Sequence, residues 1–455
     1  MKRNRFYLIV ALMLALSWVL AACGDPTATT APTTTAAPAT TAAAKTATAA
    51  PATTTVAATT AVATTTAAAT TAASSNTSPL VVGMIVSRTG ALSIYGKMLE
   101  DSWPIGMEYY TKGTNKINGR DIKLVVEDDG SDANKAVEAA RKLVQQDKAE
   151  VLVGIQGSAA ALAVATVNEK ELKKVLIIDV AADPSITGTA FSRYTFRTGR
   201  NTDQDALAGA TLAVDIASKK NKKIASFFQD TAFGQGGNAS WKQQATKTAG
   251  ITWTEIAVPS AATDFTPYVQ KLLDAAPDVF ILNWAGTTTP KLAQTLKDND
   301  VFSKMTLVSA IADSKVSIKS LGDAAVGFQG ASVYWHQFPK NAENDYLVKA
   351  YKDKYNTFPD FFDPGGMNIV SALSTALAKT NGDADPEKLI PAMEGMSYLA
   401  PKGKLTFRKE DHQTLQPMYL VELKKDITGT FPFAVPSLIK ELSAEEAAPP
   451  IRRKS

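Results

Sequence analysis

Short apolar runs alternate with longer helical patterns from Pro79 onward, and this alternation most constrains the fold. The apolar runs lie at residues 80–86, 122–127, 151–155 and 175–179. The helical patterns between them lie at residues 94–111, 133–146 and 159–172. Each run is nearly continuous in hydrophobic residues rather than alternating, which indicates strands covered on both faces. The pattern predicts an α/β fold built on a doubly wound parallel sheet.

The same pattern ends near residues 194–201 and then begins again. The second set of apolar runs lies at residues 223–228, 252–257, 279–284, 305–310 and 326–333, with helical patterns between them. We therefore expect two similar doubly wound lobes, each long enough to bury a core.

The remaining chain is too short for a third domain. It contains helical patterns and two strand patterns at residues 343–355, 367–379, 386–396, 404–407 and 418–423. We expect it to return to the first lobe and then to the second, so that a three-crossing hinge joins the lobes near Gly199, Gly330 and Lys402. The predicted division is residues 79–198 plus 333–401 for lobe 1, 199–332 plus 402–435 for lobe 2, and 436–455 for a C-terminal tail.

The N-terminus resembles a bacterial lipoprotein signal peptide. Basic residues in the first five positions precede an apolar stretch at residues 6–20, and small residues lead to Cys23. The resemblance implies cleavage after residue 22 and lipid attachment at Cys23, which would hold the protein on the outer face of the cytoplasmic membrane or in the periplasm. The alternative is a free thiol after an ordinary secretory signal. Cys23 is the only cysteine, so the chain cannot form an internal disulfide.

Residues 23–78 read as a disordered tether. The segment consists almost entirely of Ala, Thr and Pro and has no aromatic residue. Such a composition cannot bury enough apolar surface to offset the entropy lost on ordering.

Composition excludes several classes of function. The formal net charge is +4, and three of these charges lie in the predicted signal at Lys2, Arg3 and Arg5, so the folded body lacks the positive surface that nucleic-acid binding needs. His336 and His412 are the only histidines, which leaves no residues for a clustered His/Cys metal site or a Cys-His nucleophile. We predict no catalytic residue, no cofactor and no metal.

From Pro79 to about Leu423 the chain resembles the type I periplasmic binding proteins, and more narrowly the branched-chain amino-acid receptors of ATP-driven importers. Several short motifs carry this resemblance in a consistent order. They are the segments 83–90, 95–96, 127–132, 153–158, 181–184, 230–234, 264–265 and 401–408.

The resemblance implies a ligand site between the lobes, at the carboxyl ends of the strands. The residues that match the family's ligand contacts are Tyr95, Gln156, Gly157, Ser158, Ala181, Asp183, Phe233 and Trp284. Ser158 follows a strand and precedes a helix, where free N–H groups favour an anion. Simpler roles stay open: Ser158 and Asp183 as helix N-caps, and the aromatic residues as core.

Two departures from the family pattern leave the ligand open. Asp183 stands where the family often has threonine, and no carboxylate occupies the aligned ammonium-binding place within residues 309–313, although Asp313 is close. An amino acid, an amide or a small organic acid all remain possible.

The predicted function is that of a lipid-anchored, monomeric solute receptor that delivers its ligand to the permease and ATPase subunits of an ABC importer. A surface sensor of the same fold is the alternative. An exported hydrolase is disfavoured, because the chain has no Gly-x-Ser-x-Gly motif and few histidines.

Overall fold

The computed structural model describes residues 77–453. The predicted signal, Cys23 and nearly all of the predicted tether lie outside the described residues.

The first lobe is built on a sheet in the order β2-β3-β1-β4-β5-β6. Its strands are β1 (Leu80–Val86), β2 (Lys116–Ile117), β3 (Arg120–Asp128), β4 (Val151–Gly154), β5 (Val175–Ile178) and β6 (Thr195–Arg197). All neighbouring pairs are parallel except β2 with β3. The first four predicted strands are confirmed to within a few residues.

The second lobe is built on a sheet in the order β16-β15-β11-β10-β9-β7-β8. Its strands are β7 (Lys223–Asp230), β8 (Thr252–Pro259), β9 (Val279–Asn283), β10 (Thr306–Ser309), β11 (Gln329–Ser332), β15 (Met418–Lys424) and β16 (Val435–Leu442). Strands β7 to β11 are parallel, whereas β15 and β16 are antiparallel additions at one edge. Both sheets are therefore mixed and mostly parallel.

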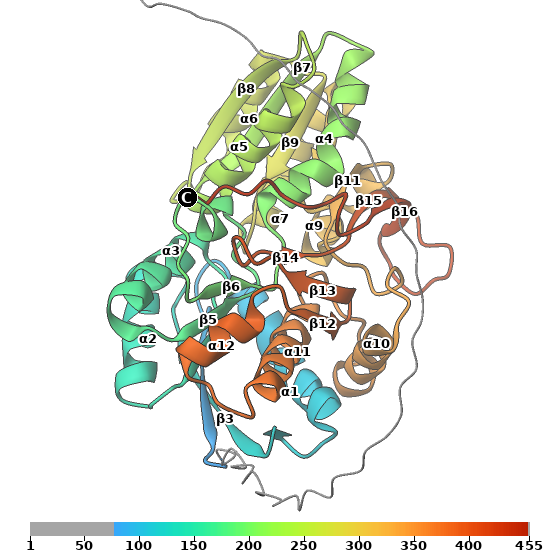
Figure 1. Cartoon of the computed structure of the whole chain (residues 1–455). Coiled ribbons are helices and arrows are strands. Elements are labelled where there is room, and N and C mark those ends of the chain that lie inside the picture. Colours follow the sequence, from blue (N-terminus) through green and yellow to red (C-terminus); the bar gives the residue numbers. More distant parts are fainter. Residues whose placement is uncertain (1–76, 454–455) are drawn as a thin grey trace, which may run out of the picture. The chain divides into compact units, whose positions relative to one another are not determined.

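Helices cover both faces of each sheet (Figure 1). In the first lobe they are α1 (Ser93–Thr111), α2 (Ala133–Gln145), α3 (Ser158–Val167), α10 (Ala342–Tyr355), α11 (Pro364–Lys379) and α12 (Pro386–Met393). In the second lobe they are α4 (Thr202–Ser218), α5 (Ala232–Ala245), α6 (Thr266–Ala275), α7 (Thr289–Asp298), α8 (Val301–Lys304) and α9 (Lys315–Leu321). Short helical turns complete the described part at Asn168–Leu172, Pro184–Thr187 and Gly322–Ala325.

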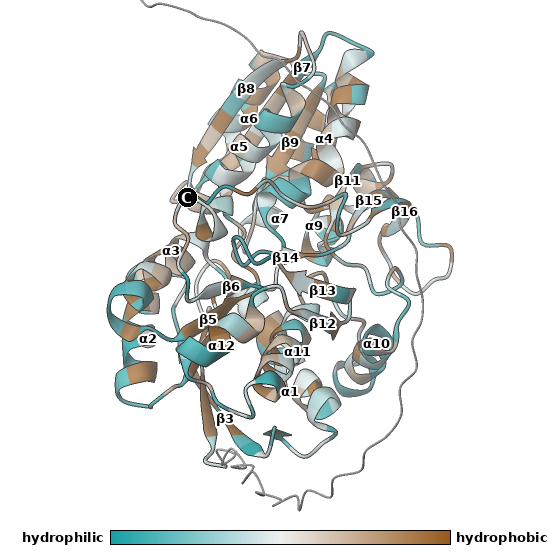
Figure 2. Ribbon diagram, viewed as in Figure 1, coloured by the Kyte–Doolittle hydropathy of each residue, from teal (hydrophilic) through white to brown (hydrophobic). Residues whose placement is uncertain are grey.

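Each sheet separates two hydrophobic layers, as its apolar strands require. In the first lobe α1, α11 and α12 pack on one face, and α2 and α3 pack on the other. In the second lobe α6 and α7 face α4 and α5 across the sheet. Figure 2 shows the result, with brown on strands such as β5 and β9 and teal on the outer parts of α2 and α12. The continuous hydrophobic runs reflect burial on both sides.

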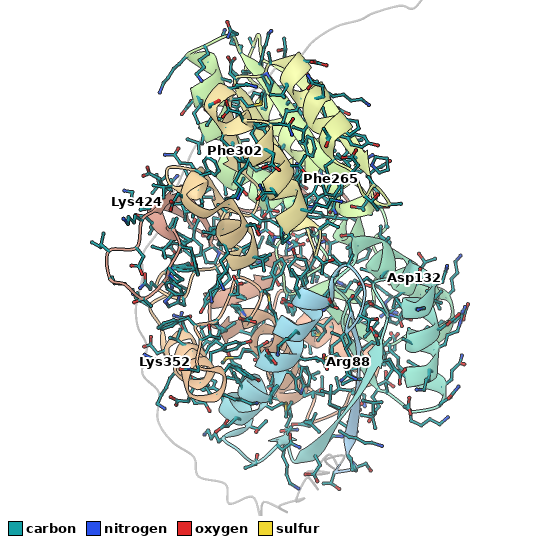
Figure 3. The ribbon with its side chains drawn as sticks, turned by 180° about the vertical axis from the view of Figure 1, so that it is seen from behind. Arg88, Asp132, Phe265, Phe302, Lys352 and Lys424 are labelled. Atoms are coloured by element: carbon teal, nitrogen blue, oxygen red, sulfur yellow. The ribbon has the colours of Figure 1, made fainter. Side chains whose placement is uncertain are left out.

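Helix starts follow ordinary capping chemistry. Asp132 precedes α2, and its carboxylate accepts hydrogen bonds from the backbone N–H groups of Asn134 and Lys135; its position is labelled in Figure 3. Asn201 and Gln204 form a reciprocal capping box at the start of α4. Such caps fix the residue at which each helix begins after the loop that follows its strand. The candidate site lies on these loops.

The third crossing lies later than Lys402. Strands β12 (Ser397–Ala400), β13 (Gly403–Phe407) and β14 (Thr414–Leu415) form a small separate sheet. Leu405 and Phe407 are fully buried in the core of the first lobe, so this strand belongs there and not to the second lobe as the sequence suggested. The chain crosses back only between β14 and β15, and the second crossing follows β11.

The last residues form structure rather than a free tail. Residues Val435–Leu442 form strand β16, paired with β15. Beyond this strand the red segment in Figure 1 runs across the molecule toward the C mark. Ala447 is fully buried, and the Nη1 group of Arg408 donates to the carbonyl of Pro449 at 2.7 Å. The predicted boundary at residue 436 therefore falls inside a strand.

Candidate functional site

A cavity of about 280 Å³ lies where the carboxyl ends of the two sheets meet. In the first lobe its lining comes from the loops that follow β1, β3, β4, β5 and β6 and from the loop before α11. In the second lobe it comes from the ends of β7 to β10 and the loops after them. In the first sheet β1 lies between β3 and β4, and in the second β7 lies between β8 and β9. These are the points where the strand order reverses, and open α/β sheets bind ligands there.

Five predicted site residues line this cavity. They are Tyr95, Gln156, Gly157, Ser158 and Phe233. The first four come from the first lobe, and Phe233 comes from the first turn of α5 in the second lobe. The structure thus brings predicted residues from both lobes to one cavity.

Tyr95 connects the two lobes at the cavity. Its hydroxyl oxygen accepts a hydrogen bond from the backbone N–H of Gly286 at 2.9 Å. Its ring makes edge contacts with Phe361 and Phe362, at centroid distances of 5.8 and 5.3 Å. Burial raises the pKa of the Tyr95 phenol to about 12, so the hydroxyl keeps its proton at neutral pH. The hydroxyl can therefore donate a hydrogen bond to a ligand.

A strained turn positions the residues after β4. Gly154 has φ +113°, and a side chain there would approach the carbonyl oxygen of Ile85 to 2.2 Å, so only glycine fits. Ile155 follows with φ +68°, an unfavourable conformation for a β-branched residue that costs about 1–3 kcal/mol. The turn directs Gln156 and Ser158 to the cavity.

Ser158 acts as a link between loops rather than as a helix cap. Helix α3 begins at Ser158 itself, with Gly157 at the N-cap position. The Ser158 hydroxyl oxygen accepts hydrogen bonds from the backbone N–H groups of Ala182 and Asp183, both at 3.2 Å. With both acceptor sites used, the hydroxyl proton is the group that remains for a ligand.

Gln156 offers a second donor. Its side-chain oxygen Oε1 accepts from the backbone N–H of Ser87 at 2.8 Å, which fixes the orientation of the amide. Its Nε2 group is buried and has no hydrogen-bond partner within the described residues. Buried amide groups without partners are rare in folded proteins, and here the amide lines a cavity.

Three predicted site residues do not line the cavity. Ala181 is buried just behind it, although its neighbours Val180 and Ala182 line it. The carboxylate of Asp183 accepts from the N–H and the hydroxyl of Ser185, so it caps the following turn.

Trp284, expected as a side wall, belongs to the core of the second lobe. Its ring packs edge-on against Phe265 at 5.2 Å, and its indole N–H donates to the hydroxyl of Thr288 at 3.0 Å. Phe265 is labelled inside that lobe in Figure 3. Trp284 therefore packs in the core of the second lobe, which is the simpler of the two roles considered for it.

Asp313 also has a structural role. It is fully buried, and one carboxylate oxygen accepts from the hydroxyl of Ser332 and from the N–H groups of Val333 and Tyr334. Burial raises the pKa of Asp313 to about 6. These contacts fix the second crossing between lobes, so Asp313 is not placed to bind a ligand ammonium.

Arg200 is the main lining residue that sequence reasoning missed. It lies at the first crossing and is about 1% exposed. Its Nε group donates to Asp205 at 3.3 Å, and its Nη1 group lies 3.4 Å from the carbonyl oxygen of Val180. Its guanidinium stands over the ring of Phe362, which also lines the cavity. The sequence feature that could have identified Arg200 is its position just after a strand, at the predicted first crossing.

Further charged groups lie buried at the crossings behind the cavity. Lys402 donates to Oε1 of Gln416 at 2.7 Å, and burial lowers the pKa of its amine to about 7. Burial raises the pKa of Asp205 to about 6, against the attraction of Arg200. Asp179 accepts from Thr198 at 2.8 Å. Lys402, Asp313, Arg200, Asp179 and Asp205 act on one another electrostatically and form one buried charged group.

The lobes touch each other beside the cavity. The backbone N–H of Thr287 in the second lobe donates to the carbonyl of Ala91 in the first at 2.9 Å. Gly236 of α5 lies so close to Pro184 that an added side chain would approach it to 2.9 Å. The described arrangement is thus one in which the two lobes close around the cavity.

Neither a metal cluster nor a spanning helix is found among residues 77–453. No group of three His, Cys, Asp or Glu side chains there is arranged to hold a metal ion. No helix in that part of the chain has the length and hydrophobicity needed to cross a bilayer.

Comparison with known proteins decides the family. Residues 79–428 match the model of a family described as periplasmic binding protein. The chain belongs to the periplasmic binding protein family. As a member of this family it is a type I, Leu/Ile/Val-binding-like binding protein that acts outside the cytoplasm, and not an enzyme.

Relatives of this periplasmic binding protein span most of its length. A Leu/Ile/Val-binding protein homolog of Brucella melitensis is 26% identical over 361 residues, which cover 77% of this chain and 89% of that protein. A solved structure of an ABC-type branched-chain amino acid transporter from Rhodopseudomonas palustris is 39% identical, with a TM-score of 0.67 and coverage of 83% of this chain and 100% of that one.

A second solved structure contains an aromatic acid. It is a solute binding protein of an ABC transporter from Rhodopseudomonas palustris in complex with 3,4-dihydroxybenzoic acid. It is 27% identical to this periplasmic binding protein, with a TM-score of 0.71, and covers 80% of this chain and 98% of that one.

Proposed function

We propose that the protein is a lipid-anchored solute receptor that closes its two lobes over a small polar molecule and delivers it to an ABC permease. The observation that carries the proposal is the cavity of about 280 Å³ between the carboxyl ends of both sheets. A ligand in this place contacts both lobes and so favours the closed state over the open one. No covalent step is needed.

The proposed ligand contacts are the predicted residues that line the cavity. Gln156, Gly157 and Ser158 supply polar groups at the start of α3, and Tyr95 and Phe233 supply aromatic surface from the two lobes. Helix α5 also begins at the cavity. Two helix N-termini give the cavity a positive potential.

The names of relatives support a carboxylic acid or an amino acid as the ligand. One relative is named for leucine, isoleucine and valine, and the other holds 3,4-dihydroxybenzoic acid. Amino acids, amides and small organic acids therefore form the screening set.

Binding is tested by thermal unfolding of the purified protein with each compound of this set. A ligand present at a hundred times its dissociation constant stabilises the folded state by about 2.7 kcal/mol. We expect at least one compound to raise the midpoint and to bind with one-to-one stoichiometry in calorimetry. A set without any binder would contradict the proposed function.

Delivery to a permease is tested in cells that lack the protein. We expect loss of uptake of the radiolabelled ligand, restored by the wild-type chain. Unchanged uptake together with a lost transcriptional response to the ligand would instead favour the sensor.

A further inference from the structure

The cavity presents an excess of hydrogen-bond donors. The Nη2 group of Arg200 and the Nε2 group of Gln156 are both buried and have no partner within the described residues. The hydroxyl of Ser158 can donate a hydrogen bond, because its oxygen already accepts hydrogen bonds from two backbone N–H groups. These three side chains line one cavity. A donor set of this kind, which includes a guanidinium paired with Asp205 through Nε alone, is suited to an anion.

Within the described residues, the lining of this cavity contains no carboxylate that could accept a hydrogen bond from a ligand. No Asp or Glu is among the residues around the cavity in the described part of the chain. The acids at neighbouring sequence positions lie outside this lining: Asp183 caps a turn, one oxygen of Asp205 pairs with Arg200, and one oxygen of Asp313 holds the second crossing. The second oxygens of Asp205 and Asp313 are buried without a partner within the described residues. An ammonium group in this cavity would therefore lose its hydration without gaining a carboxylate, which is unfavourable.

The rest of the lining is largely apolar. Leu92, Tyr95, Val180, Phe233 and Phe362 contribute hydrocarbon surface from both lobes. The edge contact between Tyr95 and Phe362 and the guanidinium of Arg200 over Phe362 fix this wall. An apolar or aromatic body fits such a wall better than a second charged group.

We propose that the ligand is a carboxylate with an apolar or aromatic body and no ammonium group, and that Arg200 binds its carboxylate together with Gln156 and Ser158. This inference rests on the proposed function, since it assigns the ligand class of the same cavity. It also assigns Arg200 as a specificity-determining residue. The pairing of Arg200 with Asp205 uses only its Nε group, and Nη2 has no hydrogen-bond partner within the described residues.

Matched ligand pairs test the ligand class. Benzoate and benzamide differ in charge at one position, and 4-methylpentanoate and L-leucine differ by the ammonium group. Calorimetry on the purified protein should show benzoate binding at least tenfold more tightly than benzamide, and 4-methylpentanoate at least tenfold more tightly than L-leucine. Equal or tighter binding of benzamide or L-leucine would overturn the inference and leave the proposed function standing. Failure of every compound in the wider set would contradict the proposed function itself.

Variants test the role of Arg200. Loss of Arg200 alone would leave Asp205 buried without its partner, so the double variant Arg200→Gln/Asp205→Asn keeps the pair neutral. We expect at least a thirtyfold loss of affinity for the tighter-binding carboxylate, with a folded circular dichroism spectrum. The matched control is Arg193→Gln, an exposed arginine paired with Glu387, which should bind like wild type. Unchanged affinity in a folded double variant would overturn the role of Arg200.

Arg200→Lys provides a second, more conservative test. It keeps the positive charge beside Asp205 but removes the planar group that can bind a carboxylate through two nitrogens. We expect affinity for the carboxylate between those of the wild type and the double variant. Affinity equal to that of the wild type would contradict recognition by the guanidinium.

Discussion

Arg452 donates two hydrogen bonds, each 2.7 Å long, to the two carboxylate oxygens of Asp203, which lies 249 positions earlier in the chain. Asp203 is fully buried in the first turn of α4, directly after the first crossing. The neighbouring Arg453 donates to the carbonyl of Glu410 and lies over the ring of Phe191, both in the first lobe. The end of the described chain is thereby attached to both lobes.

The first prediction concerns this attachment. Arg452→Ala leaves the buried Asp203 carboxylate with the hydroxyl of Ser240 as its remaining partner. Because Arg452 is partly exposed and water can reach the gap, we expect a loss of about 1–3 kcal/mol in the free energy of unfolding, measured in urea. The control Arg453→Ala, at an exposed position, should lose less than about 1 kcal/mol. Equal effects of the two variants would contradict this account of the tail.

Tyr95→Phe should weaken ligand binding without unfolding the protein. The variant keeps the buried ring and removes only the hydroxyl that accepts from Gly286 in the other lobe. Loss of one such hydrogen bond corresponds to about 1 kcal/mol, or roughly fivefold in affinity, measured by calorimetry. Tyr95→Ala is less informative, because the ring packs on Phe361 and Phe362 and its removal would disturb the core.

Tyr109→Phe is the matched control. Tyr109 lies on the same helix, but its hydroxyl contacts Glu343 on α10, away from the cavity. The affinity of the Tyr109→Phe variant for the ligand should equal that of the wild type. An equal loss in both variants would mean that the effect comes from the helix and not from the cavity.

Lys402 predicts a specific dependence of stability on pH. Burial lowers the pKa of its amine to about 7, whereas the pKa of an unfolded lysine is about 10.4. Between these values the folded protein binds fewer protons than the unfolded chain, so this residue makes stability rise with pH. Each tenfold difference in proton affinity is worth about 1.4 kcal/mol.

Lys402→Met removes this titration. The free energy of unfolding of the wild type, minus that of the variant, should therefore increase by a few kcal/mol between about pH 7 and about pH 10. Urea unfolding at a series of pH values measures it. Lys404→Met, at an exposed lysine two positions later, is the control and should give a constant difference. A constant difference for Lys402→Met as well would show that its amine is not held in a low-pKa environment.

Cys23→Ser tests the membrane anchor, which lies outside the described residues. We expect the variant to leave the membrane fraction and appear in the soluble or secreted fraction, because no acyl chain can be attached. Cell fractionation measures this, and metabolic labelling with palmitate should mark the wild type alone. A variant that stays in the membrane fraction would argue against lipid anchoring.

Much of the fold could be predicted because its strands are buried on both faces. Runs such as Val151–Gly154 and Val175–Ile178 are continuous in hydrophobic residues, and their neighbours along the chain pair in parallel. The third crossing could not be placed in this way. The pattern of Gly403–Phe407 predicts a strand, but only packing on the first-lobe core shows to which lobe it belongs.

The candidate site could be predicted in part. Residues directly after β1, β4 and β7 reach the cavity because the carboxyl ends of parallel strands share one edge. Asp183 and Trp284 stand at similar places, yet local partners turn their side chains to a helical cap and to the core. Arg200 had no motif to mark it, because its importance depends on the unpartnered Nη2 group in the closed arrangement.

A crystal structure of the protein with the tightest-binding carboxylate of the panel tests the central claim most directly. We predict electron density for the ligand in the cavity between the starts of α3 and α5, with its carboxylate within hydrogen-bonding distance of Arg200 Nη2. Density at another place, or a carboxylate directed away from Arg200, would contradict the account.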